Sequence, residues 1–228
     1  MDLSEANLLL DPTPLPIETG WERLPDGVVH VAARTDMHHC TGQMFEWWFR
    51  WRCDTQKYIW WHPIDHVSST WAGDLADDTH VGSVHVVTER FTGLPAEDLQ
   101  IQFRDPTEFF DAAACDKART GGAISCAVVG RTAVGEVASD DDGRLLGGRL
   151  LHVGRDTPWG LALRSHFYLG QDLPALGLSP AEVTEAVSEE FAVALLQHAY
   201  NEFTFLSRFL PSLYLAEHRD TTTIEAPW

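Results

Sequence analysis

Residues 179–211 read SPAEVTEAVSEEFAVALLQHAYNEFTFLSRFLP, and this stretch decides the fold that we expect. Ser179 stands as an N-cap, Pro180 occupies the first helical position, and Glu182 follows the cap by three residues, as in a capping box. Apolar residues then recur at intervals of three, four and seven, as on one buried helix face. They are Val183, Val187, Phe191, Ala194, Leu195, Phe205, Leu206 and Phe209. The stretch therefore predicts one long helix with an apolar side.

His198 and Glu202 interrupt this apolar side. Both lie three or four residues from apolar positions, so both should point into the protein, one turn apart on the same side. A buried carboxylate is costly unless it is paired, hydrogen-bonded or bound to a metal. Two interpretations follow. The residues form an ordinary hydrogen-bonded or salt-bridged core pair, or they are two ligands of a metal ion whose other ligands lie elsewhere in the chain.

Composition limits the class of protein. The chain has 228 residues, 44% of them hydrophobic, which is enough for the core of a single domain spanning residues 1–228. Its 34 acidic and 16 basic residues give a formal net charge of -18, which argues against nucleic acid or an anionic membrane as a partner. No signal peptide and no bilayer-crossing stretch is expected. The four cysteines (Cys40, Cys53, Cys115 and Cys126) show no CxxC spacing, which favours a cytoplasmic protein with reduced thiols.

The N-terminal third combines a Pro-rich start with an aromatic segment. Residues 1–36 are expected to form an irregular segment over the surface, with a short extended piece at Val28–Ala32. Residues 37–51, MHHCTGQMFEWWFRW, predict a helix capped by Thr41. So many aromatic residues suit either a helix packed in the core or one that lines a pocket for a flat ligand.

Two segments that follow predict strands with candidate site residues. Lys57–His66, KYIWWHPIDH, reads as a buried strand that ends in a turn at Pro63, with His62 at the end of the strand. A His in this place is commonly structural, but sites are also built at strand ends. Gly82–Phe91, GSVHVVTERF, alternates as a strand, and Glu89 shares a face with Val87, so Glu89 points either inward or to solvent.

Further strands are predicted downstream, separated by turn-rich or acidic pieces. They are 99–103, 123–129, 144–153 and 161–169. Several strands followed by a helix at the end predict an α+β fold, in which an antiparallel sheet curls around the long C-terminal helix. The cavity of such a fold lies between sheet and helix, so His198 and Glu202 should form part of its wall.

Three motifs together resemble the 2,4-diacetylphloroglucinol hydrolase family, which includes phloretin hydrolase. The motifs are WHPIDH at residues 61–66, VVTERF at 86–91 and QHAYNE at 197–202, and the resemblance covers roughly residues 37–210. The resemblance implies a Bet v 1/START-like helix-grip fold. It also implies hydrolysis of the carbon–carbon bond between an acyl group and a polyhydroxylated aromatic ring, as in acylphloroglucinols and acylphenols.

The resemblance also implies the residues of the site. Zinc would be held by His62, Glu89, His198 and Glu202. The proton donor to the leaving ring would be His66, His152 or His166, and the substrate contacts would include Asp65, Tyr168 and Trp61. Asp65 is a departure, because the family has a substrate-contacting Asn at this place and a carboxylate offers no amide donor.

Zinc with an open coordination position can polarise a ketone and lower the pKa of bound water, which suits this reaction. The expected partner is a small aromatic ketone, and an exposed aromatic surface could support a homodimer. Two other classes stay open. A non-enzymatic helix-grip protein that binds an aromatic or polyketide ligand would need the cavity but no metal, and a mononuclear iron oxygenase would need iron and oxygen.

Overall fold

An eight-stranded antiparallel sheet carries the fold of the computed structural model, which describes residues 1–91, 93–135 and 137–220. The strand order is β1-β2-β10-β9-β6-β5-β4-β3. The strands are β1 (Gly20–Arg23), β2 (Val29–His38), β3 (His66–Gly73), β4 (Ser83–Arg90), β5 (Ala96–Arg104), β6 (Cys126–Val134), β9 (Gly148–Thr157) and β10 (Gly160–Leu169). A separate pair joins β7 (Ala138–Ser139) to β8 (Leu145–Leu146). The expected antiparallel sheet is therefore present.

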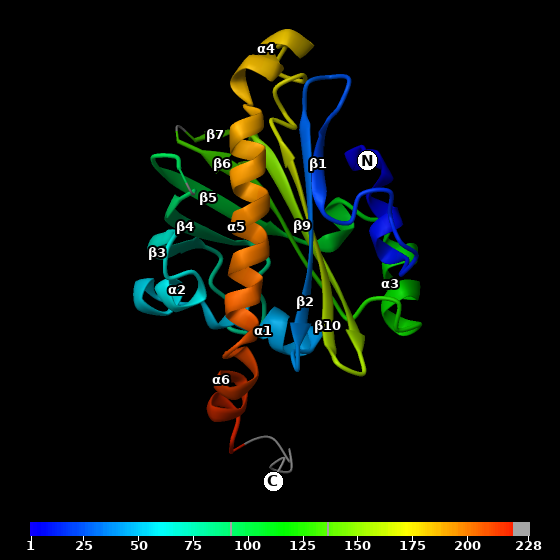
Figure 1. The fold of residues 1–228 in the computed structure, drawn as a ribbon, viewed down its shortest axis with the longest axis vertical. Helices are drawn as coiled ribbons and strands as arrows, with labels where there is room; N and C mark the ends of the chain where they lie inside the picture. Colours follow the sequence, from blue (N-terminus) through cyan, green and yellow to red (C-terminus); the bar gives the residue numbers. More distant parts are fainter. Residues whose placement is uncertain (92, 136, 221–228) are drawn as a thin grey trace.

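The predicted C-terminal helix is divided into three. A capping box at Ser179 starts α4 (Pro180–Ala186), as expected, but Val187 is extended and Ser188 caps a new helix, α5 (Glu189–Ser207). The Ser188 hydroxyl accepts a hydrogen bond from the Phe191 amide at 3.1 Å. A third helix, α6 (Leu210–Glu217), follows. The single long helix was wrong because a second N-cap interrupts it, yet α5 alone crosses the face of the sheet (Figure 1).

Two helices precede β3. Thr41 caps α1 (Gly42–Trp51), which confirms the aromatic helix, and Phe45, Trp47 and Trp48 are buried in the core. The strand expected at residues 57–66 is wrong. This segment forms α2 (Thr55–Trp61), because the Asp54 carboxylate accepts a hydrogen bond from the Lys57 amide and caps a helix there.

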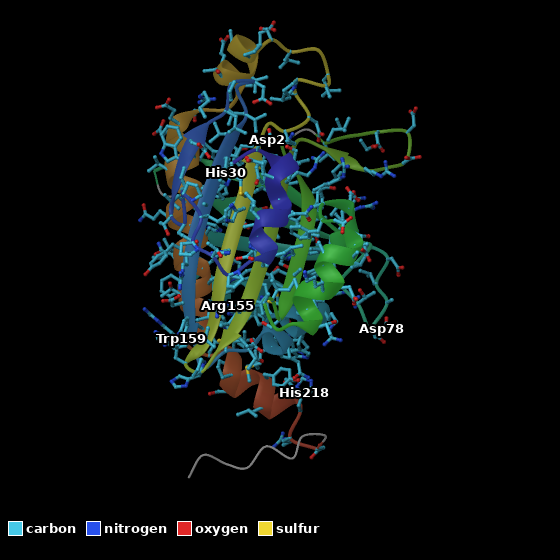
Figure 2. All side chains as sticks on the ribbon, turned by 90° about the vertical axis from the view of Figure 1, so that its right-hand side faces the viewer. Asp2, His30, Asp78, Arg155, Trp159 and His218 are labelled. Carbon is cyan, nitrogen blue, oxygen red and sulfur yellow. The ribbon has the colours of Figure 1, made fainter. Side chains whose placement is uncertain are left out.

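The N-terminal segment is more regular than expected. It contains η1 (Leu3–Leu10), a 3₁₀ helix, followed by β1 and most of β2, so an irregular segment over residues 1–36 is wrong for these parts. Val29 and Val31 of β2 pack in one apolar cluster with residues of α5, such as Leu195. η1 and α3 (Ala112–Thr120) cover the opposite face, where the short η2 (Pro106–Glu108) also lies (Figure 2). Within the described residues, no helix combines the length and apolar character needed to span a membrane.

The two faces of the sheet bury different side chains. On the α5 side, β4 presents His85, Val87 and Glu89, so of the two orientations left open for Glu89 the structure has the inward one. Three expected strands match observed ones closely: 82–91 matches β4, 99–103 lies within β5, and 161–169 lies within β10. The strand expected at 123–129 begins only at Cys126, the first residue of β6. Because α5 covers a face that also carries polar groups, the space between them is where a site can form.

Candidate metal centre and cavity

Four buried side chains from three elements converge between the sheet and α5. His66 begins β3, Glu89 lies on β4, and His198 and Glu202 lie one turn apart on α5. The Nε2 atom of His66 lies 3.9 Å from one oxygen each of Glu89 and Glu202. The Nε2 atom of His198 lies 3.6 Å from Glu89 and 4.0 Å from Glu202. Two imidazole nitrogens thus face the same two carboxylates.

Strand register explains why His66 takes part. His66 is paired with Glu89 across β3 and β4, and a register irregularity separates His66 from Ser68. Cross-strand partners have adjacent side chains on the same face. The side chain of His66 therefore lies beside that of Glu89. The His66 ring also contacts Tyr58, eight residues earlier in the chain.

Tyr58 fixes the orientation of His66. The Nδ1 atom of His66 lies 2.8 Å from the Tyr58 carbonyl oxygen, which can only accept, so Nδ1 carries the proton. The two rings stack with their centroids 3.7 Å apart, and the Tyr58 hydroxyl donates to Glu89. The buried Nε2 atom of His66 has no hydrogen-bond partner among the described residues. Its lone pair therefore faces the two carboxylates, as a metal ligand requires.

Asp65 performs the equivalent role for His198. The Nδ1 atom of His198 lies 3.0 Å from Asp65 Oδ2, so Nδ1–H donates to the carboxylate and Nε2 is left toward Glu89 and Glu202. This places Asp65, which is 2% exposed, behind His198 and outside the residues that line the cavity, so its position does not favour the expected substrate contact.

His62, the first expected ligand, lies next to this pair. Its Nδ1 accepts the Asp65 amide proton at 3.0 Å, and its Nε2 lies 3.4 Å from Asp65 Oδ2. The rings of His62 and His198 stack with centroids 4.9 Å apart. His62, Asp65 and His198 offer ligand atoms within 4.8 Å, as do His66, Glu89 and His198. Among the described residues, however, His62 makes no ion pair with Glu89 or Glu202.

The electrostatics of the four-residue cluster show an excess of negative charge. Burial lowers the pKa of His198, but Glu89, Asp65 and Glu202 outweigh it and raise that pKa to about 9. Burial raises the pKa of Glu202 to about 8, against the attraction of His198. Burial also holds the pKa of His66 well below its usual value, and the positive charge of His198 acts in the same direction. Without a cation, protons must therefore compensate the buried carboxylates at neutral pH.

A metal ion fits this donor set. Two imidazoles and two carboxylates suit Zn²⁺, with bonds of about 2.1 Å that give tetrahedral edges of roughly 3.4 Å. The four His–Glu distances of 3.6–4.0 Å exceed this edge by a few tenths of an ångström. His66, Glu89 and His198 offer ligand atoms within 4.8 Å of one another, a group that does not include Glu202. No Lys or Arg pairs with Glu89 or Glu202 in the part of the chain that the structure describes, so an ordinary salt bridge does not account for the two carboxylates.

An apolar cavity of about 80 Å³ opens beside this cluster. Tyr58, Glu89, His198 and Glu202 form part of its wall, and so do the expected Trp61 and His152. The His152 Nδ1 atom lies 2.9 Å from the Ser165 hydroxyl, and burial lowers the pKa of His152 to about 3. The wall of the cavity therefore carries a neutral imidazole, that of His152, in addition to the histidines of the cluster.

His166 and Tyr168 face the other side of the sheet. Alternation along β10 points Phe167 and Leu169 into the cavity and their neighbours away from it. His166 Nδ1 lies 2.8 Å from His30 Nε2, and the Tyr168 ring packs against His30, where η1 covers both. His166, expected as a proton donor, and Tyr168, expected as a substrate contact, therefore lie outside the cavity.

Two residues of the site were missed or given another role. Tyr58 was placed in a strand, and His66 was expected as a proton donor, whereas its ring lies among the candidate ligands. A signal for His66 was present, because SSTW after His66 reads as the start of a strand that could pair with the one carrying Glu89.

Comparison with known proteins gives the family of the chain. A family model described as the DAPG hydrolase PhiG domain matches residues 1–215. The 2,4-diacetylphloroglucinol hydrolase of Pseudomonas protegens is 26% identical over 93% of this chain and 72% of that protein. Phloretin hydrolase of Eubacterium ramulus is 27% identical over 86% of this chain and 70% of that protein. Among solved structures, protein Ms6760 from Mycobacterium smegmatis aligns with a TM-score of 0.43 and 9% identity, over 88% of this chain and 99% of that chain. The chain belongs to the DAPG hydrolase PhiG domain family.

Proposed function

We propose that this protein is a zinc-dependent hydrolase that cleaves the carbon–carbon bond between an acyl group and a polyhydroxylated aromatic ring. The convergence of His66, Glu89, His198 and Glu202 at the wall of an apolar cavity carries this proposal. Family membership and the relatives named as hydrolases support it. In this proposal His66 replaces His62 as the fourth ligand. His62 instead contacts Asp65, which orients His198.

Zinc, when bound, would supply a Lewis acid for the ketone oxygen and a lowered pKa for water. Water adds its oxygen to the carbonyl carbon, the bond to the ring carbon breaks, and the acyl group leaves as a carboxylic acid. The ring carbon leaves with the electron pair and takes up one proton. Its hydroxyl groups make this step possible, because they let the ring pass through a keto tautomer.

Within the cavity, His152 is the group that we assign to this proton. Its lowered pKa keeps the ring neutral at pH 7. When Nδ1–H donates to the Ser165 hydroxyl, the lone pair of the neutral ring is on Nε2, so His152 can take the proton that the attacking water gives up and deliver it to the leaving ring carbon. Tyr58 is less suited, because its hydroxyl already donates to Glu89 and burial raises its pKa well above the usual value. Trp61 and Phe103 supply aromatic wall for the substrate ring.

The proposal also includes the fold family and the cellular location of the protein. Placement of α5 against the cavity-bearing face of the sheet supports a Bet v 1/START-like helix-grip fold. Four free, buried cysteines support the cytoplasmic location that we propose. The homodimer stays a prediction.

A direct test combines metal analysis with product analysis. Protein purified without chelator is expected to hold one zinc per chain and to convert monoacetylphloroglucinol to phloroglucinol and acetate, resolved by chromatography. Stoichiometric metal with binding but no cleavage would instead indicate a ligand-binding protein. Iron with oxygen consumption would indicate an oxygenase, and either result would overturn the proposal.

A further inference from the structure

The cavity continues past the metal cluster along α5. Glu202, His198, Leu195 and Phe191 succeed one another at intervals of four, three and four residues and all line it. A second hollow of about 490 Å³, which is more open, lies next to the cavity. The two share four lining residues, namely Thr132, Val134, Leu169 and Phe191. The two hollows therefore adjoin along these residues, and together they are called the path from the cluster to the surface.

The two ends of this path differ in chemistry. Near the cluster the wall is aromatic and carries the polar groups Tyr58, His85 and His152. Toward the surface the wall is mainly aliphatic, with Leu99, Val134, Leu169, Leu195 and Phe191. A hydroxylated ring needs hydrogen-bond partners when it is buried, so the ring fits the first end better than the second.

The outer end exposes apolar surface where a polar surface would be expected. Val134 is 44% exposed and Leu176 is 55% exposed, and both line the outer hollow. Apolar patches that continue into a cavity commonly mark a place where an apolar ligand binds. Glu97 is the charged residue among those that line this hollow, and it would repel a chain that ends in a carboxylate.

We infer that the substrate carries a long, uncharged alkanoyl chain, which lies in the aliphatic part of this path while its carbonyl carbon lies at the metal cluster. The inference rests on the proposed hydrolase function and adds the substrate class. Seven residues separate Phe191 from His198, which corresponds to roughly 10 Å along the helix. A chain of about six to eight carbons spans a similar distance, given carbon–carbon bonds of about 1.5 Å.

A chain-length series tests the inference. Acylphloroglucinols from acetyl to decanoyl are compared by kcat/KM on the zinc-loaded protein. Burial of each added methylene is expected to raise kcat/KM by about two- to four-fold until the path is filled. The octanoyl compound should therefore exceed the acetyl compound by at least roughly ten-fold. A kcat/KM that is flat or falls with chain length would overturn the inference but leave the hydrolase proposal in place.

A matched pair of variants on α5 tests where the alkanoyl chain of the substrate lies. Phe191 lines both hollows, whereas Val193, two residues later, is 50% exposed and does not line them. Phe191→Asn should lower the octanoyl-to-acetyl ratio of kcat/KM by at least about five-fold, because it places an amide in the aliphatic wall. Val193→Asn should leave the ratio unchanged. If Phe191→Asn fails to fold, Val134→Asn, at an exposed edge of the path, takes its place.

Binding separates failure of this inference from failure of the proposed function. If no acylphloroglucinol is cleaved, the hydrolase proposal fails. Dissociation constants from calorimetry then test only whether the path binds the alkanoyl chain. Tighter binding of octanoyl- than of acetylphloroglucinol, lost in Phe191→Asn but not in Val193→Asn, would still support the aliphatic path. Equal affinities for the two compounds would overturn it.

Discussion

His198 Nδ1 lies 3.0 Å from Asp65 Oδ2, on the opposite side of the imidazole from the carboxylates of Glu89 and Glu202. This hydrogen bond determines which nitrogen of His198 faces the cluster. The carboxylate also keeps the imidazole rich in electrons, as metal-bound histidines commonly require. Asp65 is thus part of the proposed metal centre although it offers no ligand to it.

Replacement of Asp65 by Ala should weaken zinc binding by about 10- to 100-fold, because His198 loses the acceptor that orients it. Asp65→Asn is the matched control, since its amide oxygen can still accept from His198, and it should fall between the wild type and Asp65→Ala. Competition with a zinc-sensitive chelator measures the dissociation constants. Equal zinc affinity in all three proteins would show that the hydrogen bond does not serve the metal.

The second prediction separates the two histidines of the WHPIDH motif. His66→Ala should lose stoichiometric zinc, because its Nε2 is a donor shared with Glu89 and Glu202. His62→Ala should keep one zinc per chain, with weaker binding, because His62 acts through Asp65. Metal content after dialysis, with circular dichroism as a check on folding, decides between them. The opposite pattern, in which His62→Ala loses zinc and His66→Ala keeps it, would restore His62 as the ligand.

The extent to which this site could be predicted depends on how local its signals are. Periodicity alone placed His198 and Glu202 inward on a helix, because spacing along one element decides which face a residue occupies, but it left Glu89 either inward or toward solvent. The choice of His66 over His62 depends on the register of β3 against β4, which is a long-range property. A resemblance of motifs could not resolve two histidines four residues apart.

The errors in the fold have comparable causes. Residues 57–61 are aromatic and β-prone, but the Asp54 cap before them starts a helix. Ser188 likewise starts a second helix within a pattern that reads as continuous. Alternation along β10 puts His166 and Tyr168 on the opposite face of the sheet from Phe167. Which of the two faces borders the cavity follows only from the packing of α5 on one face and η1 on the other.

Removal of the metal should destabilise the protein, and more so at higher pH. At a zinc concentration near 1,000 times the dissociation constant, binding contributes about 4 kcal/mol, or roughly 8–16 °C in Tm for a chain of this size. In the metal-free protein the raised pKa values of His198 and Glu202 favour folding at low pH, and this contribution is lost as pH rises through about 8 and about 9. Thermal melts with and without EDTA at pH 6 and pH 8.5 measure the effect. A gap in Tm that does not widen with pH would contradict it.

His80 should make the protein sensitive to acid, independently of the metal centre. It is 7% exposed and packs on Phe49 and Phe103, and burial lowers its pKa to about 4, although Glu46 opposes the shift. The unfolded chain binds this proton near pH 6.5, so the stability present above pH 6.5 is lost as pH falls toward 4. The loss is on the order of 3 kcal/mol.

The variant His80→Gln tests this, because it keeps a polar side chain but does not titrate. Urea titrations at pH 7 and pH 4.5 should show a smaller loss of unfolding free energy in His80→Gln than in the wild type. An equal loss in both proteins would assign the acid sensitivity to other buried histidines, such as His85, whose pKa burial lowers to about 3.

Replacement of His152 should separate proton transfer from metal binding. His152 lines the cavity, and its ring contacts Phe45 and Phe203, not the four cluster residues, so His152→Gln is expected to keep one zinc per chain. Loss of a general acid typically lowers kcat by 10²- to 10⁴-fold, and we expect an effect of about this size with little change in KM. Ser165→Ala is the matched control. It removes only the hydroxyl at 2.9 Å that sets the tautomer of His152, so its kcat should fall by a smaller factor, about ten-fold. If His152→Gln keeps its zinc and turns over substrate at the wild-type rate, the proton reaches the ring carbon from another group, and Tyr58 becomes the next residue to replace.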